Sequence, residues 1–289
     1  MNFTKLQGAG NDFILVETEG ISQNWSQLAI AMCNRHFGIG ADGLLLLLPS
    51  EIADFRMRMF NPDGSEAEAC GNGMRCLAKY VVDKRLISRK FEKAEEISVE
   101  TKAGIQKTRL HKTMGKLTKI QVGMGTPKFR AKDIPVVVEQ GAAGVKSMLS
   151  YWITVKDKEL LLDFVSMGNP HAIHFWHRPV SDFLLSRLGP EIEHHKMFPN
   201  RMNFEVAQVI NRRQIEARVW ERGARETLAC GSGACAVAVA AQIHGYVDIQ
   251  VDIKLPGGTL EVEWDGKGEV LLSGTAEIVF SGEWLLSQT

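Results

Sequence analysis

The segment Ala69-Cys70-Gly71-Asn72-Gly73 is the most informative part of the sequence for the fold, because its pattern returns 160 residues later as Ala229-Cys230-Gly231-Ser232-Gly233. Each cysteine is followed by a Gly-x-Gly turn and then by an apolar run, residues 74–82 in the first copy and 234–243 in the second. A turn that leads into such an apolar run is typical of a loop entering a helix. The repeat therefore predicts two helices, each with a cysteine beside its start.

Each of these thiols is expected to lie close to free backbone N–H groups. Asn72 and Ser232, two residues after Cys70 and Cys230, are predicted to be the N-cap residues. The unpaired N–H groups and the helix dipole favour negative charge, so a thiolate forms more easily there and a carboxylate binds. Either loop alone is equally consistent with a buried cysteine and an ordinary turn, and it is the duplication that indicates a shared site. The other thiols have no such setting and are expected in the core: Cys33, Cys76 and Cys235.

Composition argues against several classes of protein. The 289 residues include 34 basic and 34 acidic side chains, so no net charge favours a nucleic-acid or membrane partner. The longest apolar tracts, residues 44–48 and 234–241, are too short to cross a bilayer, and the N-terminus lacks the features of a signal peptide. Five cysteines, an odd number, favour a reducing compartment over a disulfide framework. We expect a soluble cytoplasmic protein.

The segments around the two cysteines occur in the same order in two halves of the chain. Asn11 precedes Cys70 by 59 positions, and Asn169 precedes Cys230 by 61. In each half, short runs with strand patterning are separated by turn residues and surround the apolar run after the cysteine. We therefore predict an α/β (α+β) fold of two pseudo-symmetric halves, each a strand-rich sheet curled around a central helix. The first half is expected to span 1–123, completed by the last strand at about 277–289, and the second 124–276.

The cleft between two such halves is the default place for a site. If both thiols face one small ligand, Cys70 and Cys230 supply an acid and a base on opposite sides of a carbon, which inversion of a stereocentre requires. Unequal surroundings hold the two protonation states apart. The polar neighbours expected to tune the pKa values of the thiols are His171 and Glu221, since the first half has Asn61 in place of the glutamate. His171 is equally consistent with a structural histidine.

Removal of a proton next to a carboxylate places negative charge on the acid group. Backbone N–H groups at Gly71, Asn72, Gly231 and Ser232 are expected to stabilise that charge.

No cofactor or metal is expected. The cysteines lack the Cys-x-x-Cys spacing of a zinc site, and no lysine has a convincing setting for pyridoxal. The segment 38–43 has the letters of a dinucleotide fingerprint, but five leucines typical of a strand follow it instead of a helix.

Five segments, in order along most of the chain, resemble those of the diaminopimelate epimerase family. They are Gly8-Ala9-Gly10-Asn11-Asp12-Phe13, Phe60-Asn61-Pro62-Asp63-Gly64-Ser65, Ala69-Cys70-Gly71-Asn72-Gly73, Met167-Gly168-Asn169-Pro170-His171, and Glu221-Arg222-Gly223 leading into Ala229-Cys230-Gly231-Ser232-Gly233-Ala234-Cys235. A series of this length and order is highly specific.

The resemblance implies a cofactor-independent, two-base interconversion of LL- and meso-diaminopimelate, on the route to lysine and peptidoglycan. It makes Cys70 and Cys230 the acid and the base, and it implies a homodimer. The substrate-binding residues that it implies are Asn11, Asn61, Gly71, Asn72, Asn169, Asn203, Glu221, Arg222, Gly231 and Ser232. The planar guanidinium of Arg222 suits a carboxylate.

Three positions depart from the family pattern. Arg225 stands where the family usually has glycine, which puts the fit of the substrate loop in question. Phe280 stands where relatives often have tyrosine near a dimer contact, and Gly43 offers no side chain where some members have glutamine.

Two other functions are also consistent with the sequence. A racemase of another amino acid, such as proline, would keep both cysteines but change the residues that bind the distal end of the substrate. Asn61, Asn203 and the pair Glu221-Arg222 together favour diaminopimelate. A non-catalytic binding or thiol-redox protein would use the cysteines as an exchangeable pair, but it gives no reason for two helix starts suited to a carboxylate.

Overall fold

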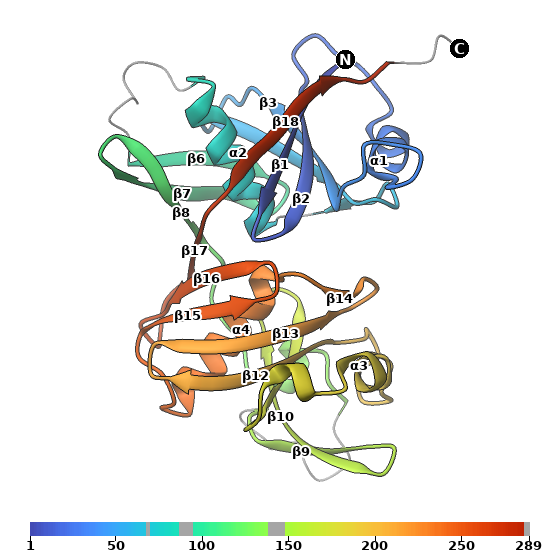
Figure 1. Ribbon diagram of the computed structural model, residues 1–289, viewed down its shortest axis with the longest axis vertical. Helices are drawn as coiled ribbons and strands as arrows, with labels where there is room; N and C mark the ends of the chain where they lie inside the picture. Colours follow the sequence, from blue (N-terminus) through green and yellow to red (C-terminus); the bar gives the residue numbers. More distant parts are fainter. Residues whose placement is uncertain (68–69, 87–94, 138–147, 286–289) are drawn as a thin grey trace. The chain divides into compact units, whose positions relative to one another are not determined.

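The computed structural model describes residues 1–67, 70–86, 95–137 and 148–285. The chain forms two compact units, one of Met1–Gly123 with Ser273–Thr289 and the other of Met124–Leu272. We describe each unit by itself (Figure 1). None of the helices in the described ranges is long and apolar enough to span a membrane.

The first unit is one sheet whose strands run in the order β18-β1-β2-β3-β4-β6-β7-β8. Its pairs are antiparallel except β2 with β3 and β4 with β6. A short strand, β5, adds to β4. The bounds are β1 (Asn2–Gly8), β2 (Asn11–Glu17), β3 (Gly43–Leu48), β4 (Phe55–Phe60), β5 (Glu66–Ala67), β6 (Glu96–Thr101), β7 (Gly104–Thr113), β8 (Lys116–Gly123) and β18 (Glu277–Glu283).

Helix α2 (Gly71–Asp83) is the centre of this unit and contacts β1 to β4, β7, β8 and β18. Helix α1 (Trp25–Cys33) packs against β3 and β4. Four of the five leucines of β3 are buried, and Leu48 is partly buried, because helices cover the sheet on both faces. Leu44 and Leu46 join the cluster beneath α1, whereas Leu45 lies beside Gly73 of α2.

The second unit repeats this plan in the order β9-β10-β11-β12-β13-β15-β16, with β14 added to β13. The parallel pairs are again the two at matching positions, β11 with β12 and β13 with β15. The bounds are β9 (Tyr151–Val155), β10 (Lys158–Ser166), β11 (Pro170–Phe175), β12 (Asn203–Asn211), β13 (Gln214–Glu221), β14 (Arg225–Thr227), β15 (Gln250–Leu255) and β16 (Gly258–Glu263). Strand β17 (Leu271–Gly274) spans the point where the chain passes back into the first unit, between Leu272 and Ser273. The 3-10 turns of the second unit are η2 (Ala131–Asp133) and η3 (Val180–Asp182).

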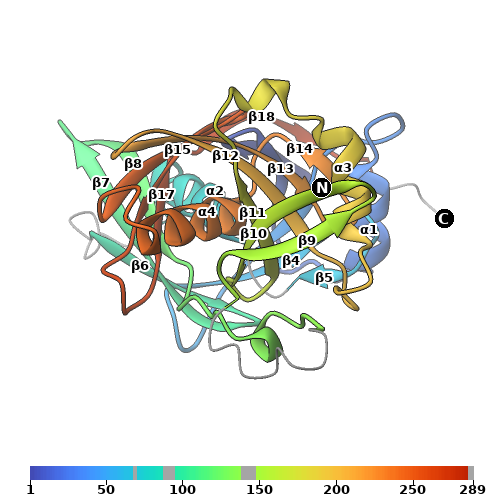
Figure 2. The ribbon, with the colours of Figure 1, turned by 90° about the horizontal axis from the view of Figure 1, so that it is seen from below.

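Helix α4 (Gly231–Ile243) is the central helix of this unit and contacts β10 to β13, β15 and β16 (Figures 1 and 2). Its side chains are mainly alanine and valine, and small residues let strands approach from several sides. Helix α3 (Leu185–Glu193) packs against β9 and β12 to β14, in the place that α1 has in the first unit.

The registers of the two units match residue by residue. In the first parallel pair of each unit, Phe13 faces Gly43 and His171 faces Asn203, each two residues after the turn asparagine. The next pair repeats the correspondence, since Phe60 faces Leu44 as Trp220 faces Phe204. The predicted strand-rich α+β fold of two similar halves is confirmed.

Two further helices are shorter than their sequence pattern indicates. Residues 25–37 carry apolar side chains at helical spacing, which predicts one helix up to Gly38. Helix α1 ends at Cys33 instead, because the side chain of Asn34 accepts hydrogen bonds from the backbone of His36 and Phe37 and so forms a turn. The pattern of residues 180–188 also predicts one helix, but this segment divides into η3 and α3, because Phe183 has an extended backbone.

Candidate active site

The two cysteines are themselves the N-cap residues of α2 and α4. Cys70 and Cys230 have extended backbones (φ −148° and −126°), and the helices begin at the next residue. The prediction that Asn72 and Ser232 are the N-caps was therefore wrong, because both lie in the first turn. The Sγ atom of Cys70 accepts the backbone N–H of Gly73 at 3.4 Å, in the manner of an N-cap side chain. Ala69 of the motif lies outside the described residues.

A second repeat concerns the turn asparagines. The Nδ2 atom of Asn72 donates to Oδ1 of Asn11 at 3.1 Å, and Nδ2 of Asn169 donates to Oγ of Ser232 at 3.1 Å. In both units, therefore, the β-hairpin turn is tied to the residue two positions after the cysteine. The structure brings Asn11 and Asn72 together at the start of α2, and Asn169 and Ser232 together at the start of α4.

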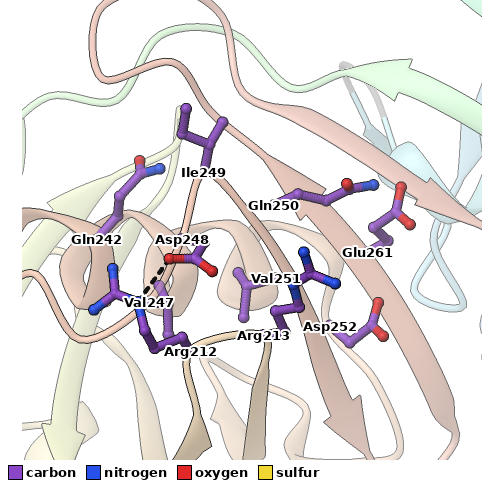
Figure 3. Close-up of a pocket in the computed structure, with 10 residues that line it drawn as sticks. All are labelled: Arg212, Arg213, Gln242, Val247, Asp248, Ile249, Gln250, Val251, Asp252 and Glu261. Atoms are coloured by element: carbon purple, nitrogen blue, oxygen red, sulfur yellow. Dashed lines mark hydrogen bonds and ion pairs between the residues drawn. The ribbon is translucent and has the colours of Figure 1, made fainter.

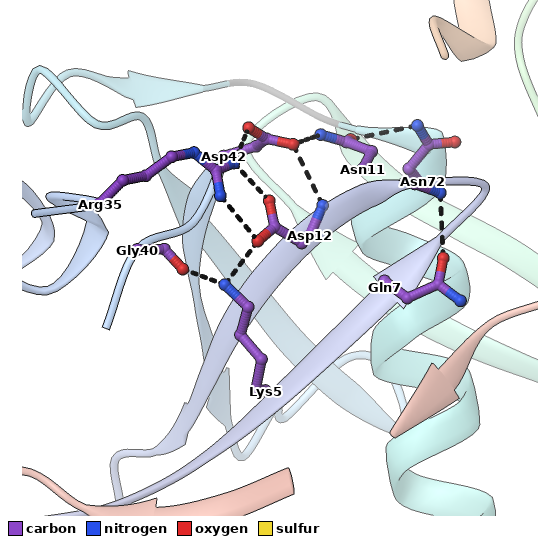
Figure 4. Close-up of polar contacts among 9 residues, drawn as sticks. Lys5, Gln7, Asn11, Asp12, Arg35, Gly40, Asp42 and Asn72 are labelled. Carbon is purple, nitrogen blue, oxygen red and sulfur yellow. Dashed lines mark hydrogen bonds and ion pairs between the residues drawn. The ribbon is translucent and has the colours of Figure 1, made fainter. Parts of the chain in front are cut away.

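An ionic network holds Asn11 in the first unit (Figure 4). Its Nδ2 atom donates to Oδ2 of Asp42 at 2.6 Å, which turns Oδ1 toward the helix start. Arg35 bridges Asp42 and Asp12, with both N···O distances 2.7 Å. The buried ammonium of Lys5 lies 2.6 Å from Asp12 and also donates to the carbonyl of Gly40. Burial raises the pKa of Asp12, but hydrogen bonds from Arg35 and Lys5 outweigh it and lower the pKa to about 2.

The second unit has a different polar group behind its helix start. His171 is completely buried, with Nδ1 2.7 Å from Oε1 of Glu205 and Nε2 3.0 Å from Oδ1 of Asn169. Asn169 in turn reaches Ser232, whose Oγ lies 3.5 Å from Sγ of Cys230. A continuous chain of polar contacts thus runs from the buried carboxyl to the sulfur.

Burial makes the Cys230 thiolate costly. The side chain is almost completely buried, and this burial, with the charges of Glu221 and Glu205, raises the pKa of Cys230 well above its ordinary value. Hydrogen bonds from Ser232 and from the backbone of Gly233 act in the opposite direction. Cys70 is more exposed than Cys230. The two thiols therefore have unequal surroundings.

Most of the other predicted binding residues cluster at one end of β13. The amide of Asn203 donates to the carbonyl of Pro170 at 2.8 Å and accepts the backbone N–H of Arg222 at 2.9 Å. Glu221 accepts from the hydroxyl of Thr227 at 2.5 Å. Asn203 thus fixes the backbone at Arg222. The exposed side chain of Arg222 donates to the backbone carbonyl of Asn200.

Asn61 follows β4 as Glu221 ends β13, so the two occupy matching places in the two units. Its amide donates to Oγ of Ser65 at 2.9 Å within the turn.

The structure shows the local conformation at two of the positions that depart from the family pattern. Arg225 has φ +64°, in the left-handed region that favours glycine, and its side chain is exposed. Gly43 has little room for a longer side chain, because a Cβ atom there would lie 3.0 Å from Cε of Met59 and 3.2 Å from the carbonyl of Phe60.

Sequence reasoning missed Glu205, Asp42 and Thr227. The signal for Glu205 was available in the repeat, because register makes it the counterpart of Leu45 in a buried strand. The partners of Asn11 and Glu221 had no comparable signal, since hydrogen bonding between separate loops leaves no periodicity.

A pocket of about 690 Å³ lies elsewhere in the second unit, at the far end of α4 from Cys230 (Figure 3). Arg212 donates to Asp248 at 2.7 Å within it, so opposite charges are already paired there. Its lining residues are Arg212, Arg213, Gln242, Val247, Asp248, Ile249, Gln250, Val251, Asp252 and Glu261. They include none of the predicted site residues. In the described part of the chain no group of three His, Cys, Asp or Glu side chains is placed to hold a metal ion.

Solved structures share this architecture. A hydroxyproline epimerase from Agrobacterium vitis with bound trans-4-hydroxy-L-proline matches with a TM-score of 0.70 and 15% identity, covering 98% of this chain and 91% of that one. A phenazine biosynthesis protein of the PhzF family from Bacillus anthracis matches with a TM-score of 0.69 and 20% identity over 99% of both chains. At these identities the likeness shows the fold.

Comparison of sequences is more specific. The profile described as Diaminopimelate epimerase matches residues 3–130 and 164–279. The diaminopimelate epimerase of Desulfovibrio desulfuricans is 45% identical over 99% of both chains, and that of Methanococcus maripaludis strain C5 is 45% identical over 98% of this chain and 99% of its own. The protein is thus an isomerase, of the class of amino-acid epimerases. Within that class, the chain belongs to the diaminopimelate epimerase family.

Proposed function

We propose that the protein interconverts LL- and meso-2,6-diaminopimelate, in lysine and peptidoglycan precursor synthesis, by moving a proton at the α carbon between Cys70 and Cys230. The substrate follows from identity to named diaminopimelate epimerases over nearly the whole chain. The observation that carries the proton transfer is the position of both thiols as N-caps of the two central helices. Racemases of other amino acids fit less well, because the hydroxyproline epimerase shares the fold at only 15% identity.

In this mechanism one sulfur acts as thiolate and takes the α hydrogen as a proton. The other, as thiol, gives its proton to the opposite face of the same carbon, which inverts the centre and exchanges the roles of the two sulfurs. Negative charge moves onto the α carboxylate as the carbon is deprotonated. We propose that this charge is stabilised by the N–H groups of Gly71, Asn72, Gly231 and Ser232, which is supported by their position in the first turns of α2 and α4.

The remaining groups recognise a ligand with two carboxylates and two ammonium groups. Arg222 offers a planar pair of donors to a carboxylate, and Glu221 offers an acceptor to an ammonium group. Four asparagines provide both donors and acceptors: Asn11, Asn61, Asn169 and Asn203. The hydrogen bond from the backbone of Arg222 to Asn203 supports this assignment, because it fixes the loop that presents the guanidinium.

His171 and Glu221 are proposed to tune the thiols. The charge of Glu221 adds to burial in raising the pKa of Cys230. His171 connects to the same thiol through Asn169 and Ser232. Neither a cofactor nor a metal takes part in this scheme.

We propose that the protein is a cytoplasmic homodimer without nucleic-acid or membrane partners. Strand β18 offers a surface for a second copy, because Val279 and Phe280 on it are 57% and 48% exposed. Light scattering on purified protein, with Phe280→Asp as the variant, tests this assembly: a monomeric wild type contradicts it.

Epimerisation itself is tested in heavy water with reduced protein and LL-diaminopimelate, without added pyridoxal or metal. We expect loss of the α-hydrogen signal and formation of the meso isomer. Cys70→Ser and Cys230→Ser are each expected to lose activity, whereas Cys235→Ala, five residues further along α4, keeps it. Activity in either serine variant contradicts the roles, and exchange of proline without diaminopimelate supports the rival racemase.

A further inference from the structure

The glycine in the first turn of each central helix lies against a different side chain in the two units. A Cβ atom at Gly73 would lie 3.1 Å from Cδ2 of Leu45, whereas one at Gly233 would lie 2.7 Å from Oε1 of Glu205. Leu45 and Glu205 are equivalent in register. The second unit therefore buries a carboxyl group where the first has a leucine, and burying such a group is unfavourable unless its partners compensate.

Glu205 is 1% exposed and contacts His171. The His171 ring lies between two oxygens, Oε1 of Glu205 at Nδ1 and Oδ1 of Asn169 at Nε2. The Asn169 amide directs its oxygen to the ring because its Nδ2 group donates to Ser232. Nε2 of His171 must therefore carry a proton to make a hydrogen bond with that oxygen.

The remaining contact, between Nδ1 and Glu205, then needs one further proton. That proton lies either on the imidazole, giving an ion pair, or on the carboxyl, giving a neutral pair, and both arrangements have the same total charge. Burial raises the pKa of Glu205 and so favours a proton within the pair. Within the described residues, Oε2 of Glu205 has no hydrogen-bond partner.

The orientation of the Asn169 amide determines which hydrogen bond reaches the sulfur of Cys230. With Asn169 donating to its Oγ, Ser232 has its own hydroxyl hydrogen available for Sγ of Cys230 at 3.5 Å. If the amide of Asn169 were reversed, the hydroxyl would donate to that amide instead, and the thiolate would lose this donor.

We propose that Glu205 is a positioning residue for Cys230: by sharing one proton with His171 it orients the Asn169 amide so that the Ser232 hydroxyl donates to the Cys230 thiolate. This inference rests on the proposed function of Cys230. The device compensates for burial and for the charge of Glu221, both of which disfavour that thiolate. The first unit has no counterpart at position 45, where a leucine stands.

The proton arrangement is tested first on the reduced wild-type protein, without any variant. In 15N spectra of histidine-labelled protein, with His171→Gln used for assignment, we expect Nε2 of His171 to be protonated. Glu205→Gln should keep this state because its amide can donate to Nδ1. In Glu205→Leu no group at Nδ1 selects a tautomer, so we expect a mixture of Nε2-protonated and Nδ1-protonated imidazole. An unprotonated Nε2 in the wild type would overturn the proposal, because it requires the reversed amide.

Kinetics provide the second readout. We expect Glu205→Leu to lower kcat about tenfold to hundredfold, since a hydrogen bond to a charged group is lost, and to raise KM by a smaller factor, since Asn169 is also proposed to bind the substrate. Glu205→Gln should restore most of kcat. Asp163→Asn is the matched control, because Asp163 is another buried carboxylate paired with a histidine, His244, in the same unit. It should change neither kcat nor the His171 signals. Equal kcat in Glu205→Leu and the wild type would contradict the proposal.

The proposed roles of Cys230 and of Glu205 can be disproved independently. An active Cys230→Ser variant overturns the role of Cys230 whatever the histidine spectra show. A wild type with the wrong His171 tautomer overturns the role of Glu205 while leaving the proposed epimerisation intact.

Discussion

The two helix starts share a backbone but differ in what lies behind them. Two neighbouring strands in each unit carry equivalent residues near the helix start. In the first unit these residues are Phe13 and Leu45, both buried and apolar, and in the second they are His171 and Glu205. The charged network of the first unit instead lies beside Asn11, on the hairpin turn. Duplicated topology therefore supplies two equivalent positions for sulfur, and the side chains around them make the two thiols unequal. A pair of groups that must be acid and base at the same time requires that inequality.

The largest expected effect concerns both thiols together. If Cys70 and Cys230 act as a unit, Cys70→Ala, Cys230→Ala and the double variant should lose activity to a similar extent, each by more than about a thousandfold. Epimerisation followed by circular dichroism measures the losses. Additive losses, with the double variant far worse than either single one, would show that the two sulfurs act independently.

The polar network of the first unit is tested at Asp42. Asp42→Leu removes the acceptor for Asn11, so we expect KM to rise about tenfold and kcat to change less, because the side chain that we propose binds the substrate loses its orientation. Asp54→Leu, in the same unit but bonded to Ser98, is the control. An unchanged KM in Asp42→Leu argues against a role for Asn11 in binding.

The same network predicts how stability depends on acid. The pKa of Asp12 falls from an ordinary 3.8 to about 2 in the folded protein, so its stabilising contribution is complete above pH 4 and is lost as the pH falls toward 2. Asp12→Asn should lower the free energy of unfolding by about 1 to 2 kcal/mol at pH 7, allowing for screening at the half-exposed Arg35. Urea unfolding at several pH values measures the difference, which should shrink below pH 4. A difference independent of pH excludes this origin.

The smallest effect is expected at Arg225. Arg225→Gly relieves a left-handed backbone at the exposed start of β14, partly offset by the greater freedom of glycine when unfolded, so we expect the free energy of unfolding to rise by about 0.5 kcal/mol. The urea midpoint should rise without a change in slope. A lower midpoint would mean that the arginine side chain makes a stabilising contact.

Much of the fold was predictable because its signals are local. Alternating runs and turn residues located most strands, and the repeated cysteine loops located both central helices. The errors also have local causes: Asn34 forms a turn that shortens α1, and both cysteines take the cap positions that polar residues usually occupy. For the candidate site, resemblance to the family supplied residues such as Asn11 and Asn203 that turn statistics alone would not distinguish.

The repeat, the two helix starts and the family can be recognised from the order of residues alone, because they depend on spacing within short segments. The groups that lie behind each thiol become apparent only once the strands are paired. His171 and Glu205 are 34 residues apart and meet because a parallel strand pair sets their register. A carboxyl in a buried strand becomes a partner of histidine or an uncompensated charge according to that pairing, which residue order alone does not specify.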